Sequence, residues 1–575
     1  MAIAHFIDEN LKVQCEEGKT ILEVIRKNNL KLETPCNGIG ICGKCKVIAK
    51  GKLSEIDTIE LPFINKEKNE RLACVAKIQG DVDVQFIKNN KNLKTVTKGK
   101  SIDVKVSPKI KKELVNNLDN KVSIPYIEYV NGDVSSIELY EKIYKLESEN
   151  VDSFEVVKNN STILDIDNKI EKVYSVAIDI GTTGISSYLI NLENGTILNK
   201  LSSLNPQTEF GGDVLTRITY CMENPNGLED LQKAITLEIN RLSGELIRGI
   251  GERKNIYNIA IAGNTTMLHL LLGISPISLA KAPYRPIFLN GLEIKATDLD
   301  IDINHEGTIL ILPNGSAYVG ADIIAGVVAS GFDRNSECSI FVDIGTNGEI
   351  VAINNGQIMG TSTAAGPALE GMNISCGCRA QEGAIEGFRI DENYHIEYSV
   401  IGDSEPIGIC GSGLLDIAAE LVKANVILSS GRFNKELPDK LKNRLKEKKF
   451  YITDNIYISQ KDIRQIQLAK GAIAAGITML LKEMNISIEN VKNAYIAGAF
   501  GYHVKGESIT SIGLIPKGFS GKIDFLGNTS LEGARLATIN EDVLKSMMSL
   551  KEKISILELS TSEEFQKHFV KELSF

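Results

Sequence analysis

The sequence lacks an apolar run long enough to cross a membrane, for which a helix needs roughly 18 residues or more. Its longest apolar stretches, around Ile323–Ser330 and Gly471–Leu481, are short and rich in glycine and alanine, which is typical of buried helices. The N-terminal residues also lack the basic segment that opens a signal peptide, and they become acidic by Asp8. These absences predict a cytoplasmic protein with no membrane segment.

Positive charge is not in excess, because 64 basic residues face 74 acidic ones and the net charge is −10. Nucleic-acid binders concentrate basic residues on one surface, so we expect no nucleic-acid partner. Cysteine is scarce as well, since ten in 575 residues are too few for a disulfide scaffold. The remaining composition, 43% hydrophobic and 24% charged, is that of an ordinary soluble chain of about three to four domains.

Changes in composition divide the chain. Residues 1–90 are predicted to form short strands and one helix that Thr20 caps. Residues 91–100 belong to a stretch of lysine, asparagine and threonine that predicts a solvated linker. Residues 101–170 carry no recognisable motif and are assigned to a small middle domain. Residues 173–575 alternate strands with glycine- and alanine-rich helices, which is typical of an α/β domain. The fold class expected is therefore multidomain, with α+β and α/β parts.

Four cysteines lie in the first 75 residues with the spacing C-x5-C-x2-C-x28-C: Cys36, Cys42, Cys45 and Cys74. A 2Fe–2S cluster needs four thiolates, and plant-type ferredoxins space theirs as C-x4-C-x2-C…C. Glycines between the ligands allow positive φ and bring backbone N–H groups towards the cluster. A four-cysteine zinc site usually has two C-x2-C pairs, whereas no second cysteine follows or precedes Cys74 at that spacing in the sequence. This part resembles a β-grasp ferredoxin domain, and the four cysteines are predicted to bind a 2Fe–2S cluster.

A sequence pattern occurs twice in the α/β part, as Val176–Gly184 and Ile340–Gly348, and both copies contain Asp-Ile-Gly-Thr. The two copies are 164 residues apart. A spacing that long implies two similar half-domains with a cleft between them, rather than a solenoid. An aspartate that ends a strand can hold a metal or a water, and the Gly-Thr turn after it can hold phosphate oxygens. The predicted catalytic residues are Asp179 and Asp343. The predicted phosphate-binding residues are Gly181, Thr182, Thr183, Gly345, Thr346 and Asn347.

A third segment, Ala494–Gly501, is an apolar strand that runs into a turn of small residues against which an adenine could lie. Together with the two phosphate turns, and in this order, it resembles the superfamily of acetate and sugar kinases, heat-shock chaperone ATPases and actin. The resemblance implies a duplicated actin-like ATPase domain that binds ATP with Mg²⁺. It assigns Gly498 and Gly501 to the adenosine end of the nucleotide.

Four further motifs accompany these three: Ala262–His269, Asn314–Asp322, Ala365–Gly371 and Gly411–Asp416. With the N-terminal cysteine motif, they resemble the reductive activators of corrinoid proteins. The resemblance implies that ATP drives a low-potential electron from the 2Fe–2S cluster to Co(II), restoring Co(I) for methyl transfer. It also implies a homodimer through the C-terminal domain, an upstream electron donor, and a partner that is a corrinoid iron–sulfur protein or a methyltransferase's corrinoid subunit.

Two other functions remain open from the sequence. One is a small-molecule kinase with a fused ferredoxin domain, which would need a substrate hydroxyl and a general base near the γ-phosphate. The other is an ATP-gated binding module whose cluster only stabilises its domain. Among weaker signals, Cys376, Cys378 and Cys410 are assigned to packing turns, and His269 to the core or to a cap. The loop Gly211–Asp213 is a polar loop between lobe elements, and an approach to the phosphates or to the partner protein is left open as the minor alternative.

Overall fold

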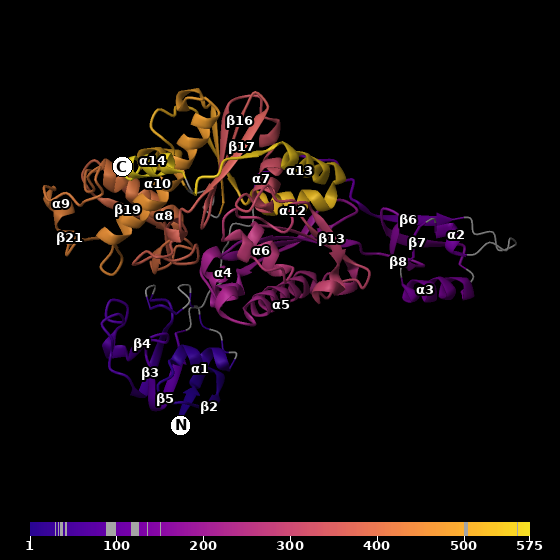
Figure 1. Cartoon of the computed structure of the whole chain (residues 1–575), viewed down its shortest axis with the longest axis horizontal. Coiled ribbons are helices and arrows are strands. Elements are labelled where there is room, and N and C mark those ends of the chain that lie inside the picture. Colours follow the sequence, from indigo (N-terminus) through magenta and orange to yellow (C-terminus); the bar gives the residue numbers. More distant parts are fainter. Residues whose placement is uncertain are drawn as a thin grey trace.

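The structure is a computed structural model that describes residues 1–28, 30, 32, 34, 38–40, 43–87, 99–116, 126–130, 132–134, 136–149, 151–498, 504–560 and 562–575. Two large sheets with their helices occupy the centre, and two smaller domains lie at the periphery (Figure 1). Within the described ranges, no helix combines the length and the apolar character needed to cross a membrane.

The N-terminal domain is a five-stranded mixed sheet with one helix, and it confirms the predicted β-grasp fold. Its strand order is β2-β1-β5-β3-β4, with β1 and β5 parallel. The elements are β1 (Ala2–Phe6), β2 (Leu11–Cys15), α1 (Ile21–Lys27), β3 (Lys46–Leu53), β4 (Glu70–Leu72) and β5 (Ile78–Phe86). The Thr20 hydroxyl accepts a hydrogen bond from the Glu23 backbone N–H, and the Glu23 carboxylate accepts one from the Thr20 backbone N–H, so the helix begins with the predicted capping box.

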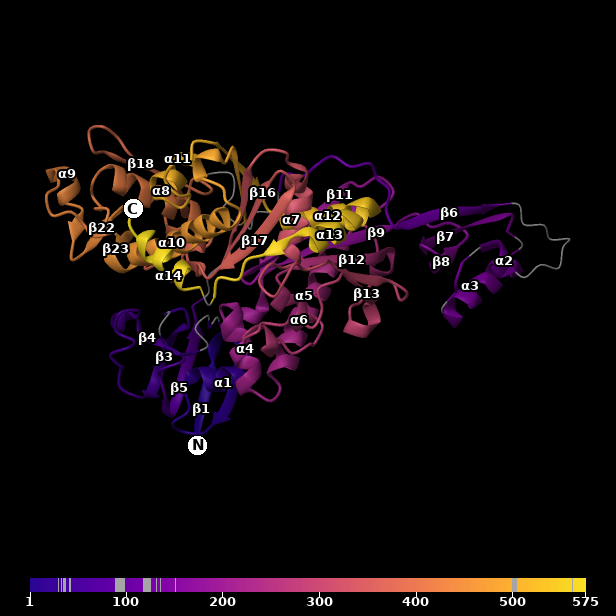
Figure 2. The ribbon, with the colours of Figure 1, turned by 45° about the horizontal axis from the view of Figure 1, so that its top comes forward.

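The next domain is a three-stranded sheet, β6-β7-β8, covered by two helices, and it projects from one end of the molecule (Figure 2). Its elements are β6 (Ile110–Asn116), α2 (Tyr126–Val130), α3 (Ile137–Ser148), β7 (Ser153–Asn159) and β8 (Thr162–Asp167). It has a small core of its own, in which Leu139 and Phe154 are buried. The Tyr257 hydroxyl donates to Asp165 at 2.6 Å and so attaches this domain to the first central sheet.

The central region consists of two lobes, each built on a six-stranded sheet. The first sheet has the order β11-β10-β9-β12-β14-β13. Its strands are β9 (Tyr174–Ile180), β10 (Gly184–Asn191), β11 (Ile197–Leu204), β12 (Ile256–Gly263), β13 (Leu292–Lys295) and β14 (Thr308–Ile311). The second sheet has the order β25-β24-β15-β16-β17-β26. Its strands are β15 (Ser339–Ile344), β16 (Gly348–Asn354), β17 (Gln357–Thr363), β24 (Asn493–Gly498), β25 (Lys522–Gly527) and β26 (Ser555–Ile556).

The two sheets confirm the duplication read from the sequence. In each, the strand with the Asp-Ile-Gly-Thr pattern forms an antiparallel hairpin with the following strand, β9 with β10 and β15 with β16. On its other side, each of these strands pairs in parallel with a later strand, β12 or β24. Asp179 and Asp343 therefore lie at equivalent positions, near the ends of β9 and β15.

Helices cover both sheets, and smaller sheets extend the second lobe. The helices are α4 (Val214–Glu223), α5 (Gly227–Ile247), α6 (Thr265–Leu271), α7 (Ala321–Ser330), α8 (Gly411–Lys423), α9 (Asp439–Lys442), α10 (Gln460–Glu483), α11 (Gly506–Ser511), α12 (Thr529–Ile539), α13 (Glu541–Lys553) and α14 (Glu563–Lys571). The remaining strands are β18 (Ala384–Ile390), β19 (Ile396–Val400), β20 (Gly408–Ile409), β21 (Leu445–Lys446), β22 (Lys449–Tyr451) and β23 (Tyr457–Ser459).

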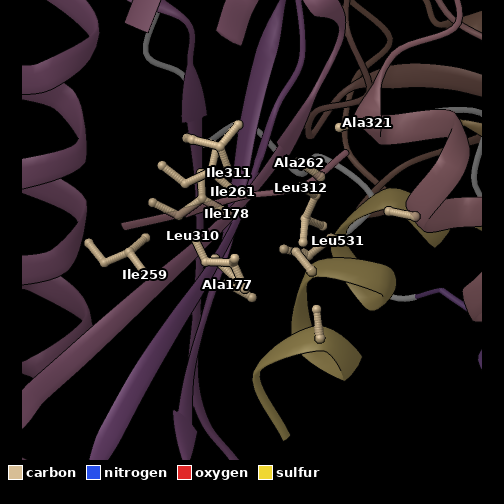
Figure 3. Close-up of a cluster of buried hydrophobic side chains, with 14 of the residues drawn as sticks. Ala177, Ile178, Ile259, Ile261, Ala262, Leu310, Ile311, Leu312, Ala321 and Leu531 are labelled. Atoms are coloured by element: carbon tan, nitrogen blue, oxygen red, sulfur yellow. The ribbon is translucent and has the colours of Figure 1, made fainter. Parts of the chain in front are cut away.

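Helix α12, which lies near the C-terminal end of the sequence, packs on the first lobe. Figure 3 shows its Leu531 on the same side of the first sheet as Ala177, Ala262 and Leu312, and all four side chains are fully buried. The helix also lies so close to α7 that a Cβ on Gly533 would be 2.5 Å from the Ala325 carbonyl oxygen. Burial of this apolar surface stabilises the first lobe and places the N-terminus of α12 near the end of β9.

Residues 99–107 run along this central region. The Lys100 backbone N–H donates to the Leu526 carbonyl at 2.7 Å, and that of Ile102 donates to the Ala329 carbonyl at 2.8 Å. The end of the predicted linker therefore pairs with the ATPase domain instead of being solvated, because its backbone continues the hydrogen bonding beside β25. Residues 91–98 of the predicted linker lie outside the described residues.

Candidate functional site

The described half of the cysteine motif lies where the β-grasp sheet brings two chain segments together. Cys45 precedes β3 and Cys74 follows β4, and the two strands pair with Lys46 opposite Leu72. Their sulfur atoms are 3.2 Å apart. Cys36 and Cys42 lie outside the described residues. The two described cysteines are thus close enough to bind one iron ion together.

The glycines of this loop fit the prediction of a cluster. Gly38 and Gly43 have φ of 84° and 66°, where L side chains are strained. A Cβ on Gly43 would be 2.3 Å from the Phe63 ring, so the backbone passes where a side chain has no room. A loop that must approach a cluster closely needs this geometry, and the residues present fit a 2Fe–2S group.

A buried ion pair that the sequence analysis missed supports the same region. Glu60 and Arg71 are joined at 2.8 Å, and Glu60 also accepts from the Leu72 backbone N–H at 2.8 Å. Both side chains are almost fully buried, so the pair fixes the loop before β4 against the strand that carries Cys74. Neither residue belongs to a local pattern that would predict this contact.

The two phosphate turns are tight hairpins, and the first glycine of each donates a hydrogen bond across its turn. The Gly181 N–H donates to the Gly184 carbonyl and the Gly345 N–H to the Asn347 carbonyl, both at 2.9 Å. In the first turn, Asp179 accepts from Asn528 at 2.9 Å and from Ser530 at 2.8 Å, both at the start of α12. These contacts orient the Asp179 carboxylate from the opposite end of the chain.

The structure brings the two predicted catalytic aspartates into one electrostatic cluster. Burial, followed by repulsion from Asp322, Asp179 and Glu370, raises the pKa of Asp343 to about 8. Burial also raises the pKa of Asp179, against the hydrogen bonds from Asn528 and Ser530. A carboxylate cluster of this kind favours a cation, because a positive ion removes the repulsion that raises these pKa values.

Asp322 and Glu370 belong to motifs noted in the sequence but had no assigned role. Glu370 ends the short 3₁₀ helix η8 (Pro367–Glu370), and it accepts a hydrogen bond from the Thr346 hydroxyl at 2.9 Å. The Thr183 hydroxyl of the other turn also counteracts the rise in the pKa of Glu370 that burial causes. Glu370 therefore holds the second phosphate turn through Thr346, while the buried Thr183 oxygen of the first turn lies near it without a hydrogen-bond partner among the described residues. Asp322 lies in the first turn of α7.

The predicted adenosine segment lies beside the second turn. Gly498 ends β24 opposite Ile344 of β15, and its φ is 107°. A Cβ there would be 2.4 Å from the Ile344 carbonyl oxygen and 2.9 Å from a carboxylate oxygen of Asp343. Only glycine fits this position, which suits a close approach of backbone to nucleotide. Gly501 lies outside the described residues.

These residues fit a magnesium–nucleotide complex better than a site for a metal alone. Among the described residues, no three histidine, cysteine, aspartate or glutamate side chains are grouped so that they could hold a metal ion. Mg²⁺ usually takes only one or two protein carboxylates and completes its shell with phosphate and water. Asp179 and Asp343, with the glycine and threonine turns beside them, are the residues that would hold such an ion.

The weaker candidates have structural roles. The ring of His269 is fully buried, lies 2.7 Å from the Thr265 carbonyl and accepts from the Ile287 N–H at 3.1 Å. Cys376 and Cys378 flank Gly377, which bridges to Ile409, and Cys410 is buried. The Gly211 carbonyl accepts from Arg217, whose guanidinium also donates to the Thr182 carbonyl, so this loop approaches the first phosphate turn.

Two duplicated lobes with paired phosphate turns, joined to a β-grasp domain with paired cysteines, define an ATPase of the sugar-kinase, heat-shock chaperone and actin class fused to a 2Fe–2S domain. Family models agree. One described as a 2Fe-2S iron-sulfur cluster binding domain matches residues 5–79, one described as the RACo middle region matches residues 174–335, and one described as the C-terminal domain of RACo, the ASKHA domain, matches residues 337–575.

Individual relatives match most or all of the chain. The corrinoid activation enzyme RamQ of Eubacterium limosum is 30% identical over 99% of this chain and 98% of its own length. A reductase of the methylated amine-specific Co(II) corrinoid protein from Methanosarcina barkeri is 28% identical over 70% of this chain and 77% of its own length. A solved structure of a reductive activator for a corrinoid iron–sulfur protein is 30% identical, covers 100% of this chain and 98% of its own, and has a TM-score of 0.75. The chain belongs to the family of reductive activators of corrinoid proteins.

Proposed function

We propose that the protein uses ATP to reduce the Co(II) of a corrinoid protein to Co(I) with one low-potential electron, which restores the cobalt for methyl transfer. One observation carries the proposal: a single chain, similar throughout to corrinoid activators, contains both a paired-cysteine loop and two carboxylate-bearing phosphate turns. When bound, the 2Fe–2S cluster supplies one-electron chemistry and ATP supplies free energy.

The chain's own residues have distinct tasks in this proposal. Cys36, Cys42, Cys45 and Cys74 hold the cluster. Asp179 and Asp343 hold Mg²⁺ from the two lobes, while the glycines and hydroxyls of both turns hold phosphate oxygens. Glu370, hydrogen-bonded to Thr346, accepts a proton from the attacking water, because its raised pKa makes it a stronger base than an ordinary glutamate. Gly498 and Gly501 accommodate the adenosine.

Further details of the proposal concern the assembly. We assign the partner as a corrinoid iron–sulfur protein or a corrinoid methyltransferase subunit, and the electron source as a separate low-potential donor. We also propose a homodimer through the C-terminal domain and a cytoplasmic location. The domain boundaries proposed are 1–90 for the ferredoxin domain, 101–170 for the middle domain and 173–575 for the ATPase domain.

A single-turnover experiment tests this function against a kinase. The protein is reduced, mixed with ATP and a Co(II) corrinoid protein, and followed by its visible spectrum and by phosphate analysis. We expect loss of the reduced-cluster signal together with appearance of Co(I) and free inorganic phosphate. Transfer of the γ-phosphoryl group to a small metabolite, with no change in cobalt, would contradict the proposal and support the kinase.

A further inference from the structure

One neighbouring segment, residues 205–217, holds all three backbone carbonyls of the Gly181–Thr183 turn. The Gly181 carbonyl accepts from the Asn205 side chain at 2.9 Å, and the Thr183 carbonyl accepts from the Asn205 backbone N–H, also at 2.9 Å. The Thr182 carbonyl accepts from the Arg217 guanidinium. Every carbonyl of the Gly181–Thr183 turn therefore depends on this segment for its position.

The buried side chain of Arg217 connects the parts of this segment by hydrogen bonds. Its side chain is fully buried, and within the described part of the chain it forms no ion pair with a carboxylate. Its Nε donates to the Gly211 carbonyl at 2.9 Å and its Nη1 to the Gln207 side chain at 3.1 Å. One planar guanidinium thus joins the Gln207–Gly211 stretch to Thr182, and a shift of either end moves the other.

The ferredoxin domain contacts the same stretch. The Thr34 hydroxyl donates to the Glu209 carbonyl at 2.7 Å, and the Arg26 guanidinium donates to the same carbonyl at 3.3 Å and to Thr34 at 3.0 Å. Glu209 ends the 3₁₀ helix η3 (Pro206–Glu209), which follows directly on Asn205. Thr34 is two residues from Cys36 in the sequence and is almost fully buried. The cluster-binding loop is therefore attached to the support of the phosphate turn.

We propose that residues 205–213 form a docking platform through which the ferredoxin domain and the nucleotide stabilise one another. A docked ferredoxin domain fixes the Glu209 carbonyl, and through Asn205 and Arg217 it fixes the phosphate turn. A turn that is already ordered loses less entropy on binding phosphate, so docking strengthens nucleotide binding. By linkage, the nucleotide strengthens docking by the same factor. Arg217 acts as the positioning residue between them. This inference rests on the nucleotide site of the proposed function.

Calorimetric titration with a non-hydrolysable ATP analogue and Mg²⁺ tests the platform in the full-length protein. Arg26→Gln changes an exposed side chain and Thr34→Val removes one hydroxyl, and we expect each to weaken analogue binding at least threefold. Thr58→Val, an exposed threonine elsewhere in the ferredoxin domain, is the matched control and should leave affinity unchanged. Unchanged affinity in Arg26→Gln, with an intact 2Fe–2S spectrum, would overturn the inference.

Two further measurements distinguish coupling between domain docking and nucleotide binding from a local loss of structure in the variants. In an Arg217→Lys background, which keeps the charge but loses the fork of hydrogen bonds, Thr34→Val should have no additional effect on affinity. Hydrogen exchange of the segment around Arg26 and Thr34 should slow when the analogue binds to the wild type, but not to Arg217→Lys. Equal effects of Thr34→Val in both backgrounds would remove Arg217 from the coupling. None of these readouts involves cobalt, so they fail or succeed independently of corrinoid reduction.

Discussion

At the scale of single residues, the buried carboxylate of Asp343 lowers the stability of the folded protein, although we assign it a role in ATP hydrolysis. Its pKa of about 8, raised by burial and then by Asp322, Asp179 and Glu370, lies far above the value of about 3.9 in an unfolded chain. At pH values between these two pKa values, Asp343 binds more protons in the folded state than in the unfolded state. The contribution of Asp343 to the free energy of unfolding therefore falls as pH rises. A bound Mg²⁺ reverses this cost.

Asp343→Asn should therefore stabilise the protein in the absence of Mg²⁺ and nucleotide. At pH 8 we expect the free energy of unfolding to rise by about 1–3 kcal/mol, with the gain shrinking as pH falls towards 4. The same variant should lose ATP hydrolysis by orders of magnitude, because positioning and electrostatics dominate phosphoryl transfer. Denaturant titrations at several pH values and a phosphate-release assay measure both. A less stable variant at pH 8, or one that hydrolyses ATP at the wild-type rate, would contradict this account.

The cysteines give a second residue-scale prediction. Cys42→Ala should abolish the visible 2Fe–2S chromophore, because a cluster with three thiolates is incomplete. Cys15→Ala is the control: Cys15 is buried in the ferredoxin core, where its thiol points to the Ala2 carbonyl, and the spectrum should persist. Absorption and circular dichroism spectra of the purified variants decide the matter. A full chromophore in Cys42→Ala would show that the ligand set is wrong.

At the scale of elements, the sequence predicts those features that depend on residues close together in the chain. The capping box of α1, the cysteine spacing and the two Asp-Ile-Gly-Thr turns are local patterns, and they predict the start of the helix and the two similar half-domains. The contacts that orient these groups are not local. Asn528 and Ser530 reach Asp179 across 349 and 351 residues, and Arg217 reaches Thr182 across 35. Glu370 and Asp322 acquire their roles only when the two lobes meet.

The packing of β24 on β15 gives a prediction at this scale. Gly498→Ala places a Cβ against the Ile344 carbonyl oxygen at 2.4 Å, so the turn must shift, and we expect a loss of about 2–4 kcal/mol in stability together with weaker nucleotide binding. Gly356→Ala is the matched control, since Gly356 also has positive φ but no atom near its Cβ position. It should cost about 1 kcal/mol and leave nucleotide affinity unchanged. Equal effects of the two substitutions on affinity would exclude the proposed role of Gly498.

At the scale of the whole molecule, the middle domain and the ferredoxin domain both contact the first lobe. The first lobe receives the middle domain at Tyr257 and the ferredoxin domain at Glu209. The sequence predicted the kinds of domain present but not these contacts, because single hydrogen bonds between distant segments leave no periodic pattern. ATP can bias a reaction at another site only through an element with two arrangements, and we expect the two lobes to be that element.

The energetic role of ATP is the central claim. A plant-type 2Fe–2S centre lies near −400 mV, and each 59 mV uphill in a one-electron step costs about 1.4 kcal/mol. The corrinoid Co(II)/Co(I) couple is expected to lie lower, so the electron transfer alone yields little Co(I). ATP raises that yield only if it binds or reacts differently in two states of the complex.

The most direct test mixes chemically reduced protein with a Co(II) corrinoid protein and follows the Co(I) absorbance. Three samples are compared, with ATP, with a non-hydrolysable analogue and without nucleotide, and Asp343→Asn with ATP is the fourth. We predict that the yield of Co(I) is highest for the wild type with ATP and falls to the nucleotide-free level in Asp343→Asn. Equal yields in all four samples would contradict the account, because ATP would then have no part in driving the electron to cobalt.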